Sequence, residues 1–291
     1  MRMRFAVVDV DDVLLATTEV LDAAARAMLT PLAEHLGQRR AAAVQREFTR
    51  AMDVLTRQLR TCGGPSDRDY AELMQRTAWW QRGLTEAGFE VKAWSRHALV
   101  ACALEACGLP VTAAVVDAAA DQYWITVAAQ AAVRPDAAVF IRQLREAGGA
   151  IHLATGSDGF LTFDDARQTF TYVPEEAARL KLARLDGLAS LGFGADDISV
   201  GDPIGKPDPE FFRTVLDRFS VAVGRDVDLA RTVVVGDSLT NDILPLLELG
   251  AARGVWLVRD GEAAGGGSWH HPQVTVVSAL DAEEVRDAFS A

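Results

Sequence analysis

The feature that most constrains the fold is one strand that stands far from all the others. A valine-rich run from Phe5 to Val10 is separated from the next strand pattern, Ala150 to Thr155, by a long stretch of helical character. Such an apolar run is typical of a parallel strand that is buried on both faces. From Val133 onward strand and helix patterns alternate, which predicts right-handed crossovers and a doubly wound parallel sheet. The first strand therefore joins a sheet whose other members all follow the helical stretch.

The predicted strands and helices of this part of the chain are short and are separated by glycine and proline residues. The later strands are predicted at Ala150 to Thr155, Ile198 to Val200, Thr232 to Val235, Val255 to Val258 and Val274 to Val277. The intervening helices are predicted at Pro135 to Glu146, Pro209 to Phe219 and Asn241 to Leu249.

The stretch before them reads as an inserted lobe of about five helices. It is rich in alanine, and its periodicity is broken at Gly37, Gly88 and Gly108. We therefore predict a Rossmann-like α/β core from residues 1–16 and 131–291, interrupted by an all-helical domain at 17–130.

Composition narrows the functional classes. The net charge of −12 argues against nucleic acid or an anionic membrane as a partner, because both require basic patches. No apolar run is long enough to cross a membrane, and no secretory signal pattern precedes the first strand. The three cysteines, Cys62, Cys102 and Cys107, fit no disulfide or metal framework. We expect reduced thiols and a cytoplasmic protein.

Carboxylates gather where predicted strands end, and in an open parallel sheet ligands bind at those ends. Asp9 ends the first strand, and Asp11 lies two residues further on, where strand geometry points it to the same side. Asp237 and Asp242 follow the strand Thr232 to Val235. Asp237 and Asp242 could instead cap the helix that follows, and Asn241 could fill the same capping role as Asp242.

Two further segments complement these acids. Thr155 and Gly156 end the second strand and offer a hydroxyl and backbone amides to an anion. Lys206 lies between Gly205 and Pro207, and it is one of only three lysines in the chain.

The electrostatics of four converging carboxylates favour a metal. Two like charges ~4 Å apart repel by about 4 kcal/mol at an effective dielectric of about 20. One lysine cannot offset several such pairs, whereas a divalent cation can. Oxygen ligands with room for water and phosphate favour Mg²⁺. A metal, a lysine and a hydroxyl would bind a phosphoryl group, and a carboxylate in line with it is a competent nucleophile.

In this order the motifs resemble those of the haloacid dehalogenase-like (HAD) hydrolase superfamily. The resemblance rests on Asp9-Val10-Asp11-Asp12-Val13, Thr155, Lys206 and Gly236-Asp237 with Asp242. It extends over about Arg4 to Thr18 and from Val133 to the C-terminus, and the helical insert is similar to a C1-type cap. One departure is Asp12, which stands where the commonest form of the first motif has glycine. Another is the long spacing from Thr155 to Lys206, within which Asp158 to Val173 looks like an added loop near the site.

The resemblance implies a phosphatase that hydrolyses a small phosphorylated molecule. Asp9 would attack phosphorus and form an aspartyl-phosphate. Asp11 would protonate the leaving oxygen and then activate water. Thr155, with the amide of Gly156, and Lys206 would bind the phosphoryl oxygens.

The metal site is implied in the same way. Asp9, the backbone carbonyl of Asp11 and Asp237 would hold Mg²⁺. Asp242 would support the metal-bound waters or Lys206 from behind.

Four alternatives stay open beside this one. A phosphomutase would use the same Asp9 and Asp11 but return the phosphoryl group to substrate. A carbon–halogen hydrolase would need no metal and would lack Asp11. A phosphonate hydrolase would call for a lysine in the insert, where only Lys92 is present. A catalytically silent binding protein would have lost Asp9, Asp11 or Asp237, and all three are present.

Overall fold

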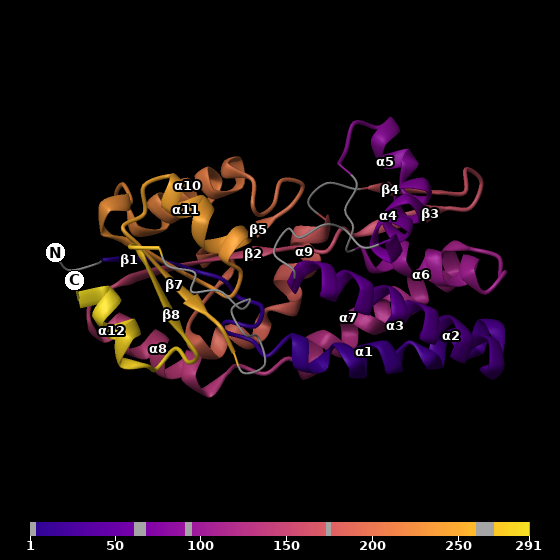
Figure 1. The fold of residues 1–291 in the computed structure, drawn as a ribbon, viewed down its shortest axis with the longest axis horizontal. Coiled ribbons are helices and arrows are strands. Elements are labelled where there is room, and N and C mark those ends of the chain that lie inside the picture. Colours follow the sequence, from indigo (N-terminus) through magenta and orange to yellow (C-terminus); the bar gives the residue numbers. More distant parts are fainter. Residues whose placement is uncertain (1–3, 61–67, 91–94, 173–175, 260–270, 291) are drawn as a thin grey trace. The chain divides into compact units, whose positions relative to one another are not determined.

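The chain forms two compact units, and each unit is built from more than one stretch of the sequence. A computed structural model describes residues 4–60, 68–90, 95–172, 176–259 and 271–290 (Figure 1). The first unit, here called the core unit, consists of Met1–Thr18, Ala131–Ser157 and Leu185–Ala291. The second, here called the inserted unit, consists of Glu19–Gln130 and Asp158–Arg184.

The core unit is built on a six-stranded parallel sheet in the order β5-β2-β1-β6-β7-β8. Its strands are β1 (Phe5–Val8), β2 (Ala150–Gly156), β5 (Ile198–Gly201), β6 (Thr232–Gly236), β7 (Arg253–Leu257) and β8 (Val274–Val277). All six were predicted within two residues at each end. β1 occupies the middle, since Val8 lies level with Leu153 on one side and Val235 on the other. The predicted fold class, an open parallel sheet of Rossmann type, is confirmed.

Helices cover both faces of this sheet. In Figure 1, α10 (Pro209–Val223) and α11 (Leu244–Glu248) lie on one side, and α8 (Pro135–Glu146) and α12 (Glu283–Ser290) lie on the other. Phe5 and Val7 of β1 share a buried apolar cluster with α10, where the Phe5 and Phe219 rings meet edge to face at 5.7 Å. Ala6 and Val8, which alternate with them and point to the other face, are buried as well, which explains why β1 is a continuous apolar run.

Short helical turns connect the longer elements. They are η1 (Thr18–Val20), η2 (Asp186–Leu191), η3 (Ala195–Asp197), η4 (Leu229–Arg231) and η5 (Leu239–Ile243). η1 begins at the last residue of the core unit, and η5 is a single π-helical turn that leads directly into α11. The predicted helix from Asn241 to Leu249 therefore corresponds to η5 and α11 together.

The inserted unit is mainly helical. Between residues 19 and 130 the described part of the chain contains helices and no strand, as predicted. These helices are α1 (Leu21–Ala27), α2 (Leu29–Leu36), α3 (Gln38–Arg60), α4 (Arg68–Trp80), α5 (Arg82–Glu86), α6 (Arg96–Ala106) and α7 (Ala113–Gln130). Their core is made of alanines and leucines around larger side chains such as Phe48 and Tyr123, both fully buried. None of the described helices combines the length and the apolar character that a bilayer crossing requires.

The inserted unit also takes in a second segment that we expected in the core. Residues 158–173 were predicted to be an added loop, and this is wrong for the part described. Strands β3 (Leu161–Asp164) and β4 (Thr169–Tyr172) form an antiparallel hairpin, followed by α9 (Glu176–Arg184). Phe163 packs against Trp80 of α4, and Thr169 donates a hydrogen bond to the Trp80 carbonyl at 2.8 Å. These contacts assign the hairpin to the helices rather than to the parallel sheet.

The two-segment insert changes one argument made from the sequence. Lys181, on α9, belongs to the inserted unit and is buried. The insert thus contains a lysine besides Lys92, which lies outside the described residues. Cys62 also lies outside them, whereas Cys102 and Cys107 are free thiols on and after α6.

Candidate active site

The site begins at the carboxyl end of the central strand. Asp9 follows β1 directly, and its backbone N–H donates to the carbonyl of Val235 on β6 at 2.9 Å. This bond extends the ladder by one residue and places Asp9 level with the end of β6, beside Gly236. The Asp9 side chain is buried, so its carboxylate is held at the sheet edge and largely removed from water.

Asp242 approaches this edge because residue 236 is glycine. A β-carbon on Gly236 would lie 2.4 Å from the β-carbon of Asp242, which no side chain tolerates. The carboxylate of Asp242 accepts the backbone N–H of Ser238 at 2.9 Å, and the Ser238 hydroxyl accepts the N–H of Asn241 at 3.2 Å. Asp242 and Ser238 therefore fix the turn from β6 into η5, as capping residues do.

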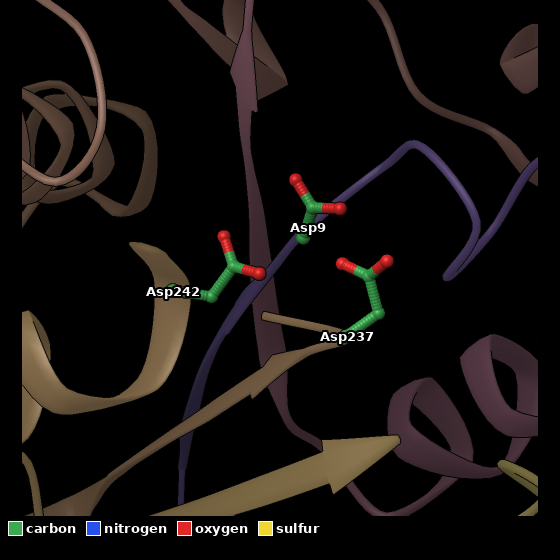
Figure 2. A group of neighbouring side chains, drawn as sticks. All are labelled: Asp9, Asp237 and Asp242. Carbon is green, nitrogen blue, oxygen red and sulfur yellow. The ribbon is translucent and has the colours of Figure 1, made fainter. Parts of the chain in front are cut away.

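Three carboxylates converge there, as Figure 2 shows. Asp9, Asp237 and Asp242 each offer an oxygen, and these oxygens lie within 4.8 Å of one another. Asp9 and Asp237 directly follow the neighbouring strands β1 and β6, and Asp242 lies on the turn η5 that comes after Asp237. The convergence expected from the strand pattern is therefore present for these three residues.

Lys206 lies between two of the acids. Its ammonium donates to Oδ1 of Asp9 and, at 2.6 Å, to Oδ1 of Asp242. The loop that carries Lys206 leaves β5 at Gly201, where an added β-carbon would lie 2.7 Å from the Cα of Gly205. Two glycines thus allow the backbone to fold tightly enough to turn the lysine toward the strand ends.

Burial and charge shift the pKa values of this cluster. Burial raises the pKa of Asp9 from 3.8 to about 7, with Asp242 adding to the rise and Lys206 opposing it. Burial and the neighbouring Asp9 and Asp242 also raise the pKa of Asp237 well above 3.8. Burial alone would lower the pKa of Lys206, but Asp242 and Asp9 outweigh it and raise that pKa. Burial and mutual repulsion thus disfavour the ionised forms of Asp9 and Asp237 more than the Lys206 ammonium favours them.

Asp11 lies apart from the three converging carboxylates. Its two oxygens accept hydrogen bonds from separate hydroxyls, Oδ1 from Thr17 at 2.8 Å and Oδ2 from Thr155 at 3.2 Å. Thr155 is fully buried at the end of β2. The sequence placed Asp11 and Thr155 in one site, and the structure brings them into direct contact.

The turn after β2 is anchored to the neighbouring strand. Gly156 ends β2, and the hydroxyl of Ser157 donates to the carbonyl of Gly201 on β5 at 2.7 Å. The Gly156 backbone is thereby fixed at the same sheet edge as Asp9, within the core unit.

Several residues of this site were not predicted from the sequence. Thr17 and Ser157 orient Asp11 and the Gly156 turn, and Arg259 donates to the backbone just after Asp11. A threonine six residues after Asp11 and a serine next to Gly156 are weak local signals that could have been followed. Arg259 has no such signal, because its partners lie more than 120 residues away along the chain.

The donor set fits a hard divalent cation. All of the converging ligand atoms are carboxylate oxygens, which such cations prefer over nitrogen or sulfur. Asp9 and Asp237 have the raised pKa values expected of clustered buried carboxylates, which a cation would lower again. Asp242 is already committed to Lys206 and to the Ser238 amide. Asp9 and Asp237 are therefore the side chains best suited to hold a metal ion.

The acidic cluster and its lysine lie at the carboxyl edge of an open parallel sheet, as the resemblance to a hydrolase family led us to expect. The family model of haloacid dehalogenase-like hydrolases matches residues 3–250, and the chain belongs to that family. No curated protein matches the sequence.

Solved structures with a similar fold include enzymes of differing chemistry. The magnesium-bound YfnB from Bacillus subtilis is 18% identical, with a TM-score of 0.55 and complete coverage of both chains. A HAD phosphatase from Thermococcus onnurineus is 17% identical, with a TM-score of 0.51 and coverage of 98% of this chain and 97% of that one. A 2-haloacid dehalogenase from Pseudomonas syringae pv. tomato is 20% identical, with a TM-score of 0.53 and the same coverage. At these identities the likeness concerns the fold alone.

Proposed function

We propose that this hydrolase is a Mg²⁺-dependent phosphatase that hydrolyses a small-molecule phosphate monoester through an aspartyl-phosphate on Asp9. The observation that carries the proposal is the convergence of Asp9, Asp237 and Asp242 around Lys206 at the strand ends. Bound Mg²⁺, held by Asp9, Asp237 and the Asp11 carbonyl, would supply positive charge to the phosphoryl oxygens.

The chain's own residues then divide the reaction between them. An oxygen of Asp9 forms a bond to phosphorus while the bond from phosphorus to the leaving oxygen breaks. Lys206 binds Asp9 and keeps a positive charge beside the reacting group, and Asp242 positions Lys206. The amide of Gly156 would bind a phosphoryl oxygen, and the hydroxyl of Thr155 could do so only by exchanging its hydrogen bond to Asp11 for one to the substrate.

Asp11 is suited to move the protons. Its carboxyl group would protonate the leaving oxygen in the first step and take a proton from water in the second. That water attacks phosphorus, releases inorganic phosphate and restores Asp9. The hydrogen bonds from Thr17 and Thr155 hold both oxygens of Asp11, so that the group is oriented before substrate binds.

Asp11 also distinguishes this chemistry from carbon–halogen hydrolysis. Halide is expelled as an anion and needs no proton, so a carboxylic acid oriented to protonate the leaving group has no role in that first step. The presence of Asp11 and its two hydroxyl donors supports an alcohol leaving group, as in a phosphate monoester.

The free thiols Cys102 and Cys107 accord with a reducing, cytoplasmic setting.

The test is hydrolysis of para-nitrophenyl phosphate in Mg²⁺ and in EDTA, with 2-chloropropionate as a second substrate. We expect phosphate release that depends on Mg²⁺ and is lost in Asp237→Asn. Asp217→Asn is the matched control, because Asp217 is an exposed acid on α10 in the same unit. Chloride release without metal, or equal phosphate release in EDTA, would contradict the proposal.

A further inference from the structure

Arg259 ties the backbone that follows Asp11 to two other parts of the core unit. It lies two residues after β7, and its side chain is 23% exposed. Nε donates to the carbonyl of Asp12 at 3.1 Å, and Nη2 donates to the carbonyl of Val13 at 3.3 Å. Nη1 donates to the carboxylate of Asp136 at 3.2 Å. All three guanidinium nitrogens therefore have a defined acceptor.

Asp136 makes this anchor rigid. It lies in the first turn of α8, and the same carboxylate oxygen that binds Arg259 also accepts the backbone N–H of Leu280 at 3.1 Å. Arg259 thus connects the exit of β7 with the start of α8 and the segment before α12. A planar guanidinium reaches three acceptors in fixed directions, which a lysine ammonium does not reproduce.

The backbone held by Arg259 adopts a conformation that needs support. Asp12 has a φ of +58°, in the left-handed region that residues with a β-carbon seldom occupy. Its carboxylate accepts the N–H of Thr18 at 2.8 Å and also the Thr18 hydroxyl. Arg259 fixes the carbonyl side of the same residue. Asp12 is thereby held at its side chain and at its backbone, one residue from Asp11.

We propose that Arg259 is a positioning residue for Asp11. By fixing the peptides of Asp12 and Val13, it determines the direction of the preceding Asp11 carbonyl and limits the motion of the Asp11 carboxyl group. The inference rests on the proposed function, in which Asp11 moves protons and its carbonyl binds the metal ion. Arg259 would act through this backbone, and the inference assigns it no contact with the reacting atoms.

The experiment compares Arg259→Ala and Arg259→Lys with Arg253→Ala. Arg253 begins the same strand at its other end and is half-buried, so its loss tests removal of an arginine from β7 in general. Turnover of para-nitrophenyl phosphate is measured at saturating Mg²⁺. Amide hydrogen exchange of residues 10–16 is measured in the metal-free protein.

We expect kcat to fall about 10- to 100-fold in Arg259→Ala with little change in KM, the range typical of groups that orient a catalytic residue. Guanidinium ion at millimolar concentration should restore part of that kcat, and Arg259→Lys should recover less than the wild-type rate. Exchange at residues 10–16 should quicken about tenfold or more while exchange in β2 and β6 stays unchanged. Arg253→Ala should leave both measurements at wild-type values.

Unchanged exchange at residues 10–16 in Arg259→Ala would overturn the proposal, and so would equal acceleration throughout the sheet. If the alanine variant fails to fold, Asp136→Asn is used instead, because Asp136 is the one charged group among the three acceptors of Arg259. Asp136→Asn should quicken exchange in the same segment, and absence of that effect would also overturn the proposal. The exchange measurement needs no substrate. A wild-type protein inactive on phosphate esters would refute the proposed function while the positioning by Arg259 is still tested.

Discussion

The core unit and the inserted unit each contain buried polar side chains, and one group in each unit shows a contrast in hydrogen bonding. In the core unit the charged side chains of Asp9, Lys206 and Asp242, each 9% exposed or less, are joined by short hydrogen bonds. In the inserted unit Gln81 and His97 are as deeply buried, yet their side-chain nitrogens and oxygens have no hydrogen-bond partner among the described residues. The first arrangement concentrates charge at one point, whereas the second leaves isolated neutral groups among helices.

This difference indicates that the proposed active site in the core unit lowers the stability of the folded protein. A buried charge cluster with raised carboxyl pKa values is typical of a functional site, because it is costly unless a ligand or metal ion compensates it. An isolated buried amide or imidazole costs about 1–3 kcal/mol and offers no reacting group in return. We therefore expect mutations at the core cluster to abolish activity, and mutations at the isolated groups to change stability alone.

The largest effect is expected for Asp9→Asn. An amide is a poor nucleophile, so turnover of para-nitrophenyl phosphate should fall by about 10³-fold or more. The pKa of Asp9 is raised in the folded state, so its stabilising contribution is complete below pH 3.8 and is lost as the pH rises through about 7. In EDTA at pH 8, Asp9→Asn should therefore melt at a higher temperature than the wild type.

The control for this prediction is again Asp217→Asn, which should leave both turnover and melting unchanged. Wild-type turnover in Asp9→Asn would remove Asp9 from the nucleophile's role. A lower melting temperature at pH 8 would show that Lys206 stabilises the cluster more than burial destabilises it.

An intermediate effect is expected from the two buried histidines, one in each unit. Burial lowers the pKa of His97 and of His152 from 6.5 to about 4. Each contributes stability that is present above pH 6.5 and is lost as the pH falls through about 4, by up to about 3 kcal/mol. His152 bonds to the Ser199 hydroxyl at 2.8 Å, whereas His97 has no such partner.

Replacement by leucine separates the two cases. His97→Leu and His152→Leu should both reduce the loss of stability between pH 6.5 and 4, measured by urea unfolding at a series of pH values. At pH 7.5 only His97→Leu should be as stable as the wild type or more so, because His152→Leu leaves the buried Ser199 hydroxyl unpaired. The exposed His35→Gln serves as the control. Equal destabilisation of both leucine variants at pH 7.5 would contradict the proposed difference between the hydrogen-bonded His152 and the unpaired His97.

The smallest effect is expected for Gln81→Leu. Gln81 is completely buried, and neither atom of its amide has a hydrogen-bond partner. An apolar side chain of similar size removes the cost of desolvating the amide, which should stabilise the protein by about 1 kcal/mol and raise its melting temperature by about 2 °C. Differential scanning calorimetry measures this directly. Gln122→Leu is the control, since Gln122 donates to Thr126 at 3.3 Å and gains nothing from the change.

The parallel sheet was predictable because its strands are short apolar runs that end at glycine, proline or polar residues. The acids at the strand ends were predictable for the same reason, since parallel topology brings Asp9 and Asp237 to one edge whatever the chain does between them. The hairpin of β3 and β4 was missed although Leu161 and Phe163 alternate with polar residues. Its strands are four residues long and pair only with each other, so the period-two signal is too short to outweigh a loop.

The positions that orient the site were harder to predict. Arg259 binds acceptors near residues 12 and 136, and no local pattern specifies contacts over such separations. The direction of the Asp11 side chain depends on Thr17 and Thr155, which only the folded backbone brings together. Sequence periodicity identifies strands and their ends, whereas side-chain orientation depends on contacts made after the strands have paired.

The chain passes between the two units four times, after residues 18, 130, 157 and 184. The inserted unit is therefore not a cassette that one deletion can excise. Removing residues 19–130 alone would leave the β3–β4 hairpin and α9 without the helices against which they pack. Any exchange of this lobe with that of a relative has to transplant both pieces together, and a recombination breakpoint between them would yield two incompatible halves.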